Sequence, residues 1–152
     1  MTKSIYNYAD EIDNNKHITF CDVYKTLLNG IDCIVCKESA ADLLGYSNGG
    51  FRRNIDVYTL HDYNLPYLNC HVVDNFSKIN VQDFHGIKVV PIEQTIIELL
   101  QDEKTDDQII FESLANYYYK NNLSFSNINP PKNLVKKFNF YAEEGKKYYE
   151  TE

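Results

Sequence analysis

Apolar residues near the amino end of the chain recur at the three- and four-residue steps of a helix. The stripe consists of Phe20, Val23, Tyr24, Leu27 and Leu28. This spacing predicts an amphipathic helix that ends at Asn29 and Gly30. The β-branched run 31–36 then predicts a strand, and residues 38–45 predict a short helix closed by a glycine. A further short helix is expected over 6–13, and a loop over 46–53.

Between residues 54 and 90 the pattern changes to short runs rich in Val, Ile, Tyr and Phe, divided by turn residues. These runs predict strands at 55–60, 68–73, 78–81 and 87–90, with turns at 62–66, 74–77 and 83–86. Strands at such short spacing favour an antiparallel sheet.

Residues 86–100 form the most informative junction, because a strand-like run leads directly into an amphipathic helix. Pro91 has a fixed φ and no amide hydrogen, so it suits the first turn of a helix and ends a strand. The apolar side chains that follow share one helical face: Ile92, Ile96, Leu99 and Leu100. Helices are therefore predicted over 91–101, 106–120 and 131–149.

These elements together predict an α+β fold. We expect a small, mostly antiparallel sheet of about four to five strands, packed with N-terminal helices and followed by a three-helix C-terminal region. A chain of 152 residues is expected to form a single domain over 1–152. Within it, residues 1–30 form a helical N-terminal segment, residues 31–100 a mixed α/β core, and residues 101–152 the C-terminal helices.

Charge and composition narrow the class of protein. A net charge of −7 argues against sequence-independent binding to nucleic acid, which depends on cationic side chains. Hydrophobic residues make up 43% of the chain, as in globular proteins. The first residues contain no apolar run typical of a signal peptide, and no later run is long enough to cross a bilayer. We therefore expect a soluble, cytoplasmic protein that does not act at a membrane.

The cysteines are interpreted as reduced core residues, as is usual in a cytosolic protein. Cys33 and Cys36 form a C-x-x-C pair, but side chains three apart on a strand point to opposite faces. One regular strand therefore cannot offer both sulfurs to one zinc ion. The neighbours Cys70 and His71 diverge for the same reason. We predict no metal site and no cofactor.

Common catalytic signatures do not occur in this sequence, including the P-loop, G-x-S-x-G, H-E-x-x-H and the dinucleotide fingerprint. Glu38 and Asp42 lie one helical turn apart, as two metal-binding carboxylates would, but an exposed acidic face is the more frequent arrangement. The histidines are scattered and are interpreted as surface or structural residues: His17, His61, His71 and His85. We therefore expect a protein that is not an enzyme.

Two groups of side chains are candidates for partner binding. Arg52 and Arg53 lie close after two glycines, and paired guanidiniums favour phosphate or carboxylate, although solvated surface charges are the more frequent explanation of such a pair. Tyr117, Tyr118 and Tyr119 span too wide an arc for all three rings to enter one core, so at least one should be exposed and available to a partner. The other two are expected in the core.

A third candidate is the acidic group where the helix over 91–101 ends and the next begins. It consists of Asp102, Glu103, Asp106 and Asp107. Acids at the start of a helix are stabilised by its dipole, which is a sufficient structural explanation. The functional alternative is that these carboxylates mimic nucleic-acid phosphates.

Residues 30–45, 54–58 and 86–100 form three segments that resemble parts of the antitoxins of the AbiEi family. Residues 30–45 are similar to the family's strand that leads into a short helix with a small residue pair and a closing leucine and glycine. Residues 54–58 match the next strand in position and character, and residues 86–100 resemble a glycine-isoleucine strand followed by a threonine-containing amphipathic helix. The similarity covers Ile31 to Leu114, and its motifs are structural.

The resemblance implies the antitoxin half of a type IV toxin-antitoxin pair, whose toxin is similar to nucleotidyltransferases and serves in bacterial abortive infection. Many family members also carry an amino-terminal winged helix that binds promoter DNA. Only about thirty residues precede Ile31, too few for a complete winged helix, so direct DNA binding is not expected. The alternative function is an acidic inhibitor or adaptor, encoded by a phage or mobile element, that binds a bacterial defence nuclease.

Overall fold

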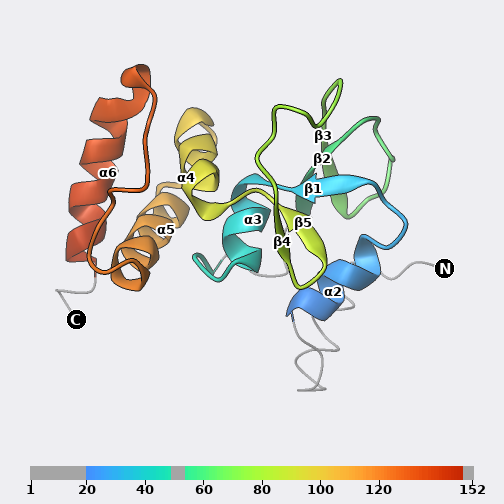
Figure 1. Ribbon diagram of the computed structural model, residues 1–152, viewed down its shortest axis with the longest axis horizontal. Helices are drawn as coiled ribbons and strands as arrows, with labels where there is room; N and C mark the ends of the chain where they lie inside the picture. Colours follow the sequence, from blue (N-terminus) through green and yellow to red (C-terminus); the bar gives the residue numbers. More distant parts are fainter. Residues whose placement is uncertain (1–19, 49–53, 149–152) are drawn as a thin grey trace.

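The computed structural model describes residues 20–48 and 54–148 and confirms an α+β fold with a small sheet and C-terminal helices (Figure 1). The helices are α2 (Phe20–Leu27), α3 (Lys37–Leu43), α4 (Ile92–Gln101), α5 (Asp107–Lys120), the short 3-10 helix η2 (Lys132–Leu134) and α6 (Val135–Lys147). The strands are β1 (Cys33–Val35), β2 (Ile55–Thr59), β3 (Leu68–Val72), β4 (Gln82–Phe84) and β5 (Ile87–Val89). The helix expected over 6–13 lies outside the described residues.

The strands form one sheet in the order β3-β2-β1-β5-β4. Neighbours β1–β2 and β4–β5 are antiparallel, whereas β1–β5 and β2–β3 are parallel. The sheet is therefore mixed rather than mostly antiparallel. Turn residues indicate where one strand ends, but the direction of the next strand depends on the path of the segment that connects the two. The segment 60–67 returns the chain to the starting end of β2, so β3 runs parallel to it.

The prediction of a strand at 78–81 is wrong, because the fourth strand of the chain, β4, begins only at Gln82. It pairs with β5 through a two-residue turn at His85 and Gly86, whose φ values of 52° and 89° are both positive. This is the type I′ geometry that suits the twist of a hairpin. Since the turn occupies two residues, β4 extends into positions that the pattern assigned to a turn. Ile79 packs instead with Phe76 against a small apolar cluster on the sheet.

The two faces of the sheet differ in what covers them. Strand residues such as Val35, Val57 and Val89 join α2 and α3 in one apolar cluster. The opposite face carries a small cluster around Ile34, together with half-buried residues of the β3–β4 connection. This second face is where polar side chains gather.

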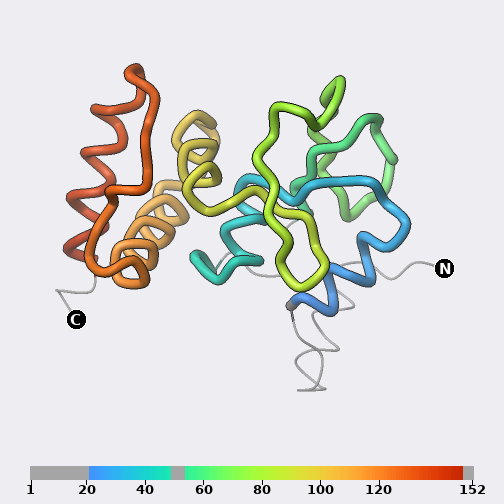
Figure 2. Tube along the Cα trace, viewed as in Figure 1, coloured from blue at the N-terminus to red at the C-terminus, as the bar shows by residue number. Residues whose placement is uncertain are grey.

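Helices α4, α5 and α6 form a separate apolar cluster and follow one another away from the sheet (Figure 2). The predicted apolar face of α4 is buried there, which confirms the helical spacing. Helices α5 and α6 pack closely at Gly145, where a Cβ atom would lie 3.1 Å from the Cβ of Leu114. Helix α3 joins the two clusters, since Ala40 packs with the sheet and Ala41 with the helices.

Two further observations concern the cysteines and the acids of α3. Cys33 and Cys36 are buried free thiols, as predicted, whereas Cys21 and Cys70 are free thiols that are only half-buried. The exposed acidic face expected for Glu38 and Asp42 is wrong for Asp42, which is buried and accepts a hydrogen bond from the hydroxyl of Ser47. Over the described ranges, every helix is too short or too polar to span a membrane.

Candidate functional site

Polar side chains occupy the second face of the sheet on β2 and β3. Side chains alternate along β2, so Ile55 and Val57 enter the core while Asp56 and Tyr58 face the opposite way. The parallel register places Asn69 beside Asp56 and His71 beside Tyr58. We call these four residues, Asp56, Tyr58, Asn69 and His71, the polar face.

Asp56 is the centre of a hydrogen-bonded group on the polar face. Its Oδ1 accepts a hydrogen bond of 2.8 Å from the side-chain amide of Asn69 and lies 3.1 Å from Nε2 of His71. The backbone N–H of Asp56 donates to the hydroxyl of Ser39 at 2.7 Å, which ties this strand to α3. The carboxylate is therefore held in a fixed position with the imidazole against it.

Tyr58 donates a hydrogen bond of 2.5 Å to Oε2 of Glu98, which reaches the polar face from α4. Glu98 is only 7% exposed, and its Oε1 has no hydrogen-bond partner among the described residues. Burial raises the pKa of Glu98, while the Tyr58 hydroxyl, Lys37 and His71 act in the opposite direction. The pKa of Tyr58 is raised by burial and by the adjacent Glu98 carboxyl. These groups form one electrostatically coupled cluster.

Lys37 stands at the junction of β1 and α3 with a φ of 53°. This left-handed conformation is unfavourable for a side chain with a Cβ, by about 1 kcal/mol or more. Cys36, directly before it, is buried, and its pKa is raised well above the usual thiol value by burial first and then by Glu98 and Asp56. The junction therefore holds Lys37 in a strained position at the edge of the polar face.

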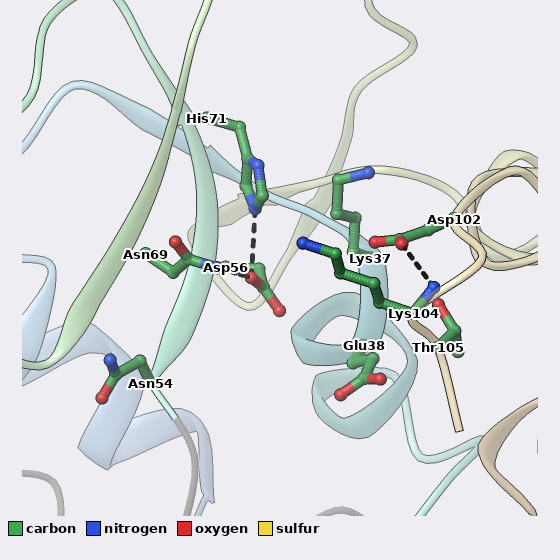
Figure 3. A pocket seen from close by; sticks show the side chains of 9 residues that line it. All are labelled: Lys37, Glu38, Asn54, Asp56, Asn69, His71, Asp102, Lys104 and Thr105. Atoms are coloured by element: carbon green, nitrogen blue, oxygen red, sulfur yellow. Dashed lines mark hydrogen bonds and ion pairs between the residues drawn. The ribbon is translucent and has the colours of Figure 1, made fainter.

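A cavity of about 300 Å³ opens beside Asp56 (Figure 3). It is lined by Lys37, Glu38, Asn54, Asp56, Asn69, His71, Asp102, Lys104 and Thr105. In Figure 3 the side chain of Lys104 extends across the cavity towards Asp56. Asp102 accepts a hydrogen bond of 2.9 Å from the backbone N–H of Lys104, which shapes the turn that carries both residues. We call this space the Asp56 cavity.

The Asp56 cavity brings cations and carboxylates together in nearly equal number. Such a lining can hold a polar or zwitterionic group through several hydrogen bonds. A group of three or more His, Cys, Asp or Glu side chains placed to hold a metal ion does not occur within 20–48 and 54–148.

The predicted tyrosine site divides between core and surface. Tyr117 is fully buried, Tyr118 is half-buried against Phe125, and Tyr119 is 44% exposed. The expectation that at least one ring is exposed is confirmed, and Tyr117 belongs to the core. Arg52 and Arg53 lie outside the described residues.

The predicted acidic group is largely engaged in local structure. Asp106 caps α5 by accepting a hydrogen bond of 2.8 Å from the N–H of Gln108. Asp107 accepts one of 2.5 Å from the hydroxyl of Tyr141, which raises the pKa of Tyr141 to about 12. Asp102 lines the Asp56 cavity, and Glu103 is exposed.

The acids and the exposed tyrosine do not form one surface. They lie at opposite ends of α5, about 20 Å apart along the helix axis at 1.5 Å per residue. The residue pattern along the chain does not by itself mark Lys37, Asp56, His71 or Glu98 as site residues. A usable signal was present in the polar residue at every second position of β2 and in the carboxylate within the apolar run of α4.

Comparisons with known proteins add no relative to this description, since no protein-family model matches the chain and no curated protein matches it.

Proposed function

We propose that the chain is an AbiEi-like antitoxin, a non-enzymatic protein that neutralises a nucleotidyltransferase-like toxin by binding it. The support comes first from where the resembling segments lie. Residues 30–45 contain β1 and α3, residues 54–58 contain most of β2, and residues 86–100 contain β5 and most of α4. Strands β2, β1 and β5 are neighbours in the sheet, and α3 contacts α4. The resemblance therefore falls on one contiguous unit.

The carboxyl end of α5 is the surface that we assign to the toxin. Leu123 is 57% exposed and has a φ of 56°, next to Asn122 with a φ of 55°. A bulky residue in this conformation is an outlier that costs about 1 to 2 kcal/mol. Tyr119, exposed at the same end of the helix, is of a type enriched at interfaces. An exposed leucine held in a costly conformation beside such a tyrosine is the observation that carries the proposal.

The alternative, an acidic inhibitor that mimics nucleic acid, has weaker support. A mimic needs carboxylates that are free to face the nuclease. Asp106 caps a helix, Asp107 accepts from Tyr141 and Asp102 accepts from the backbone N–H of Lys104, so three of the four candidate acids already have structural roles. We therefore favour the antitoxin.

Co-expression with candidate nucleotidyltransferase-like toxins tests the proposal, with growth as the readout. The wild-type chain should restore growth, and affinity purification should recover the toxin with it. Tyr119→Ala and Leu123→Asn should each weaken toxin binding about tenfold or more and reduce rescue. Phe140→Ala is the matched control, because Phe140 is 61% exposed on α6 and lies outside the proposed surface. Rescue that is equally sensitive to all three substitutions, or to none, would count against this surface.

Two assays on the purified chain test the non-enzymatic part. The protein alone should not turn over nucleotides or nucleic acid, and a time-dependent product that is lost in an Asp56→Asn variant would overturn the proposal. It should also fail to retard promoter DNA at moderate salt, because its net charge of −7 gives little phosphate attraction.

A further inference from the structure

Strand β3 lies at one edge of the sheet and pairs with β2 alone. In a parallel pair, the backbone groups of every second residue face the neighbouring strand, and those of the residues between them face away. The N–H of Val73 donates to the carbonyl of Thr59 at 2.8 Å, which fixes the odd-numbered residues of β3 as those bonded to β2. The N–H and C=O groups of Cys70 and Val72 therefore point outward from the sheet.

This outer edge is open to another strand. Within 20–48 and 54–148, the outward N–H groups of Cys70 and Val72 have no backbone partner, whereas that of Leu68 donates to the carbonyl of Leu65. Sheets commonly protect an edge with proline, lysine, a bulge or a very short strand. Strand β3 has five residues, Leu-Asn-Cys-His-Val, in an uninterrupted register. It carries none of these protections, and the side chain of Val72 is 55% exposed.

The composition of the edge favours a second copy of this chain as the occupant. The chain has a net charge of −7, yet residues 67–73 contain no Asp, Glu, Lys or Arg. Two copies can therefore meet along β3 without placing like charges in the contact. A second copy also presents the same outward N–H and C=O groups, and an antiparallel pair of identical strands lets each copy donate to the other.

Two-fold symmetry about Cys70 gives a register that is complementary on both faces and overlaps the whole of β3. In this register the N–H of Cys70 donates to the C=O of Cys70 in the second copy, and the N–H of Val72 donates to the outward C=O of Leu68. On the face of β3 towards the core, Val72 lies beside Leu68 of the second copy. On the opposite face, Asn69 lies beside His71. Pairs of matching polarity stabilise neighbouring strands.

We propose that the chain forms a two-fold dimer in which β3 pairs antiparallel with β3 of a second copy, so that the two sheets become one. The dimer changes the candidate site, because Asn69 and His71 line the Asp56 cavity and their side chains point towards Asp56 (Figure 3). Asn69 of the second copy then borders the cavity beside His71. This contact is independent of the toxin contact at the end of α5, and either can fail in experiment while the other stands.

Sedimentation velocity on the full chain tests whether the dimer exists. A contact made by one strand from each copy falls below the area of about 1,200 Å² that is typical of stable complexes, so we expect a reversible dimer with a micromolar dissociation constant. Measurements from about 10 μM to about 1 mM cover this range. The average mass should rise towards twice that of the monomer. A monomer mass at every concentration would overturn the proposal.

A substitution at Val72 tests whether β3 forms the contact. Val72→Lys places a charge beside Leu68 of the second copy and should raise the dissociation constant of the dimer at least tenfold. The side chain is exposed in the single chain, so circular dichroism should show an unchanged fold. The matched control is Val81→Lys, the same change at an exposed valine outside β3, which should leave the dissociation constant unchanged. A dimer of equal strength in a folded Val72→Lys variant would place the interface elsewhere and refute the proposal.

Amide hydrogen exchange, followed by NMR, tests the register in the wild-type chain and does not depend on any variant. The N–H groups of Cys70 and Val72 should exchange several-fold more slowly at high protein concentration than at low concentration. Those of Asn69 and His71 face β2 in the single chain, so their exchange should not change and provides the internal control. Exchange at Cys70 and Val72 that is independent of concentration, whether fast or slow, would overturn the proposal.

Discussion

Removing the Tyr58 hydroxyl tests the buried hydrogen bond that organises the polar face. In Tyr58→Phe, Oε2 of Glu98 loses its donor at 2.5 Å while Oε1 remains unpartnered, so no side chain within 20–48 and 54–148 donates a hydrogen bond to the carboxyl. Hydrogen bonds to charged groups contribute about 1.5 to 3 kcal/mol. The ring itself is retained, so almost no apolar contact is lost. We expect the free energy of unfolding at pH 7 to fall by about 2 kcal/mol.

Urea unfolding followed by circular dichroism measures this change directly, and the melting temperature should fall by about 4 to 8 °C for a chain of this size. Tyr63→Phe is the matched control, because the Tyr63 hydroxyl makes only a 3.3 Å contact, with the backbone N–H of Asp32 at the surface. Its effect should stay within about 0.5 kcal/mol. The double variant Tyr58→Phe with Glu98→Gln should lose much less than the two single effects suggest. A loss below 0.5 kcal/mol for Tyr58→Phe, or strict additivity in the double variant, would refute the reasoning.

Three further predictions concern single positions. Burial raises the folded-state pKa of Glu98 above 4.5, so the folded protein binds more protons than the unfolded chain and its stability falls as the pH rises from about 4.5 through the folded-state pKa. Glu98→Gln, with Tyr58, Lys37 and His71 unchanged, should remove this loss of stability, which amounts to about 1.4 kcal/mol for each unit by which the pKa is raised. Urea unfolding from pH 4 to 7 measures the free energy of unfolding of both proteins. An identical pH dependence of stability in the variant and the wild type would contradict the prediction. Asp106→Ala removes the cap on Gln108 and should cost about 1 kcal/mol, whereas Asp106→Asn, which keeps an acceptor, should cost little. Lys37→Asn should raise stability by about 0.5 to 1 kcal/mol because asparagine tolerates the left-handed region, and a clear loss would show that the lysine side chain stabilises the fold.

Elements set by local periodicity could be predicted well from the sequence. The stripe of Ile96, Leu99 and Leu100 identified α4 within one residue at its start, and the helix predicted from residue 106 begins one residue later, at Asp107. The displaced strand β4 shows the limit of this approach. Its position depends on His85 adopting a positive φ, which the residue type permits but does not require.

The candidate site was harder to predict, because its residues are far apart in the sequence. Asp56 and His71 meet because β2 and β3 pair in parallel. The residue pattern of a strand does not reveal whether it pairs in parallel or antiparallel with its neighbour. Glu98 lies on a helix whose other buried residues, apart from Thr95, are ordinary apolar core residues. Its importance follows from Tyr58 opposite it and from the oxygen left without a partner.

The sequence by itself determined the local conformations of this protein, since helix and strand preferences depend on neighbouring residues and on their spacing. It also determined that α4 must bury one face and that Pro91 must separate strand from helix. Only the tertiary structure decided which strands pair in parallel, which of the three tyrosines is buried, and which polar residues share a cavity. These are contacts between distant segments, and their energies depend on the packing of the whole chain.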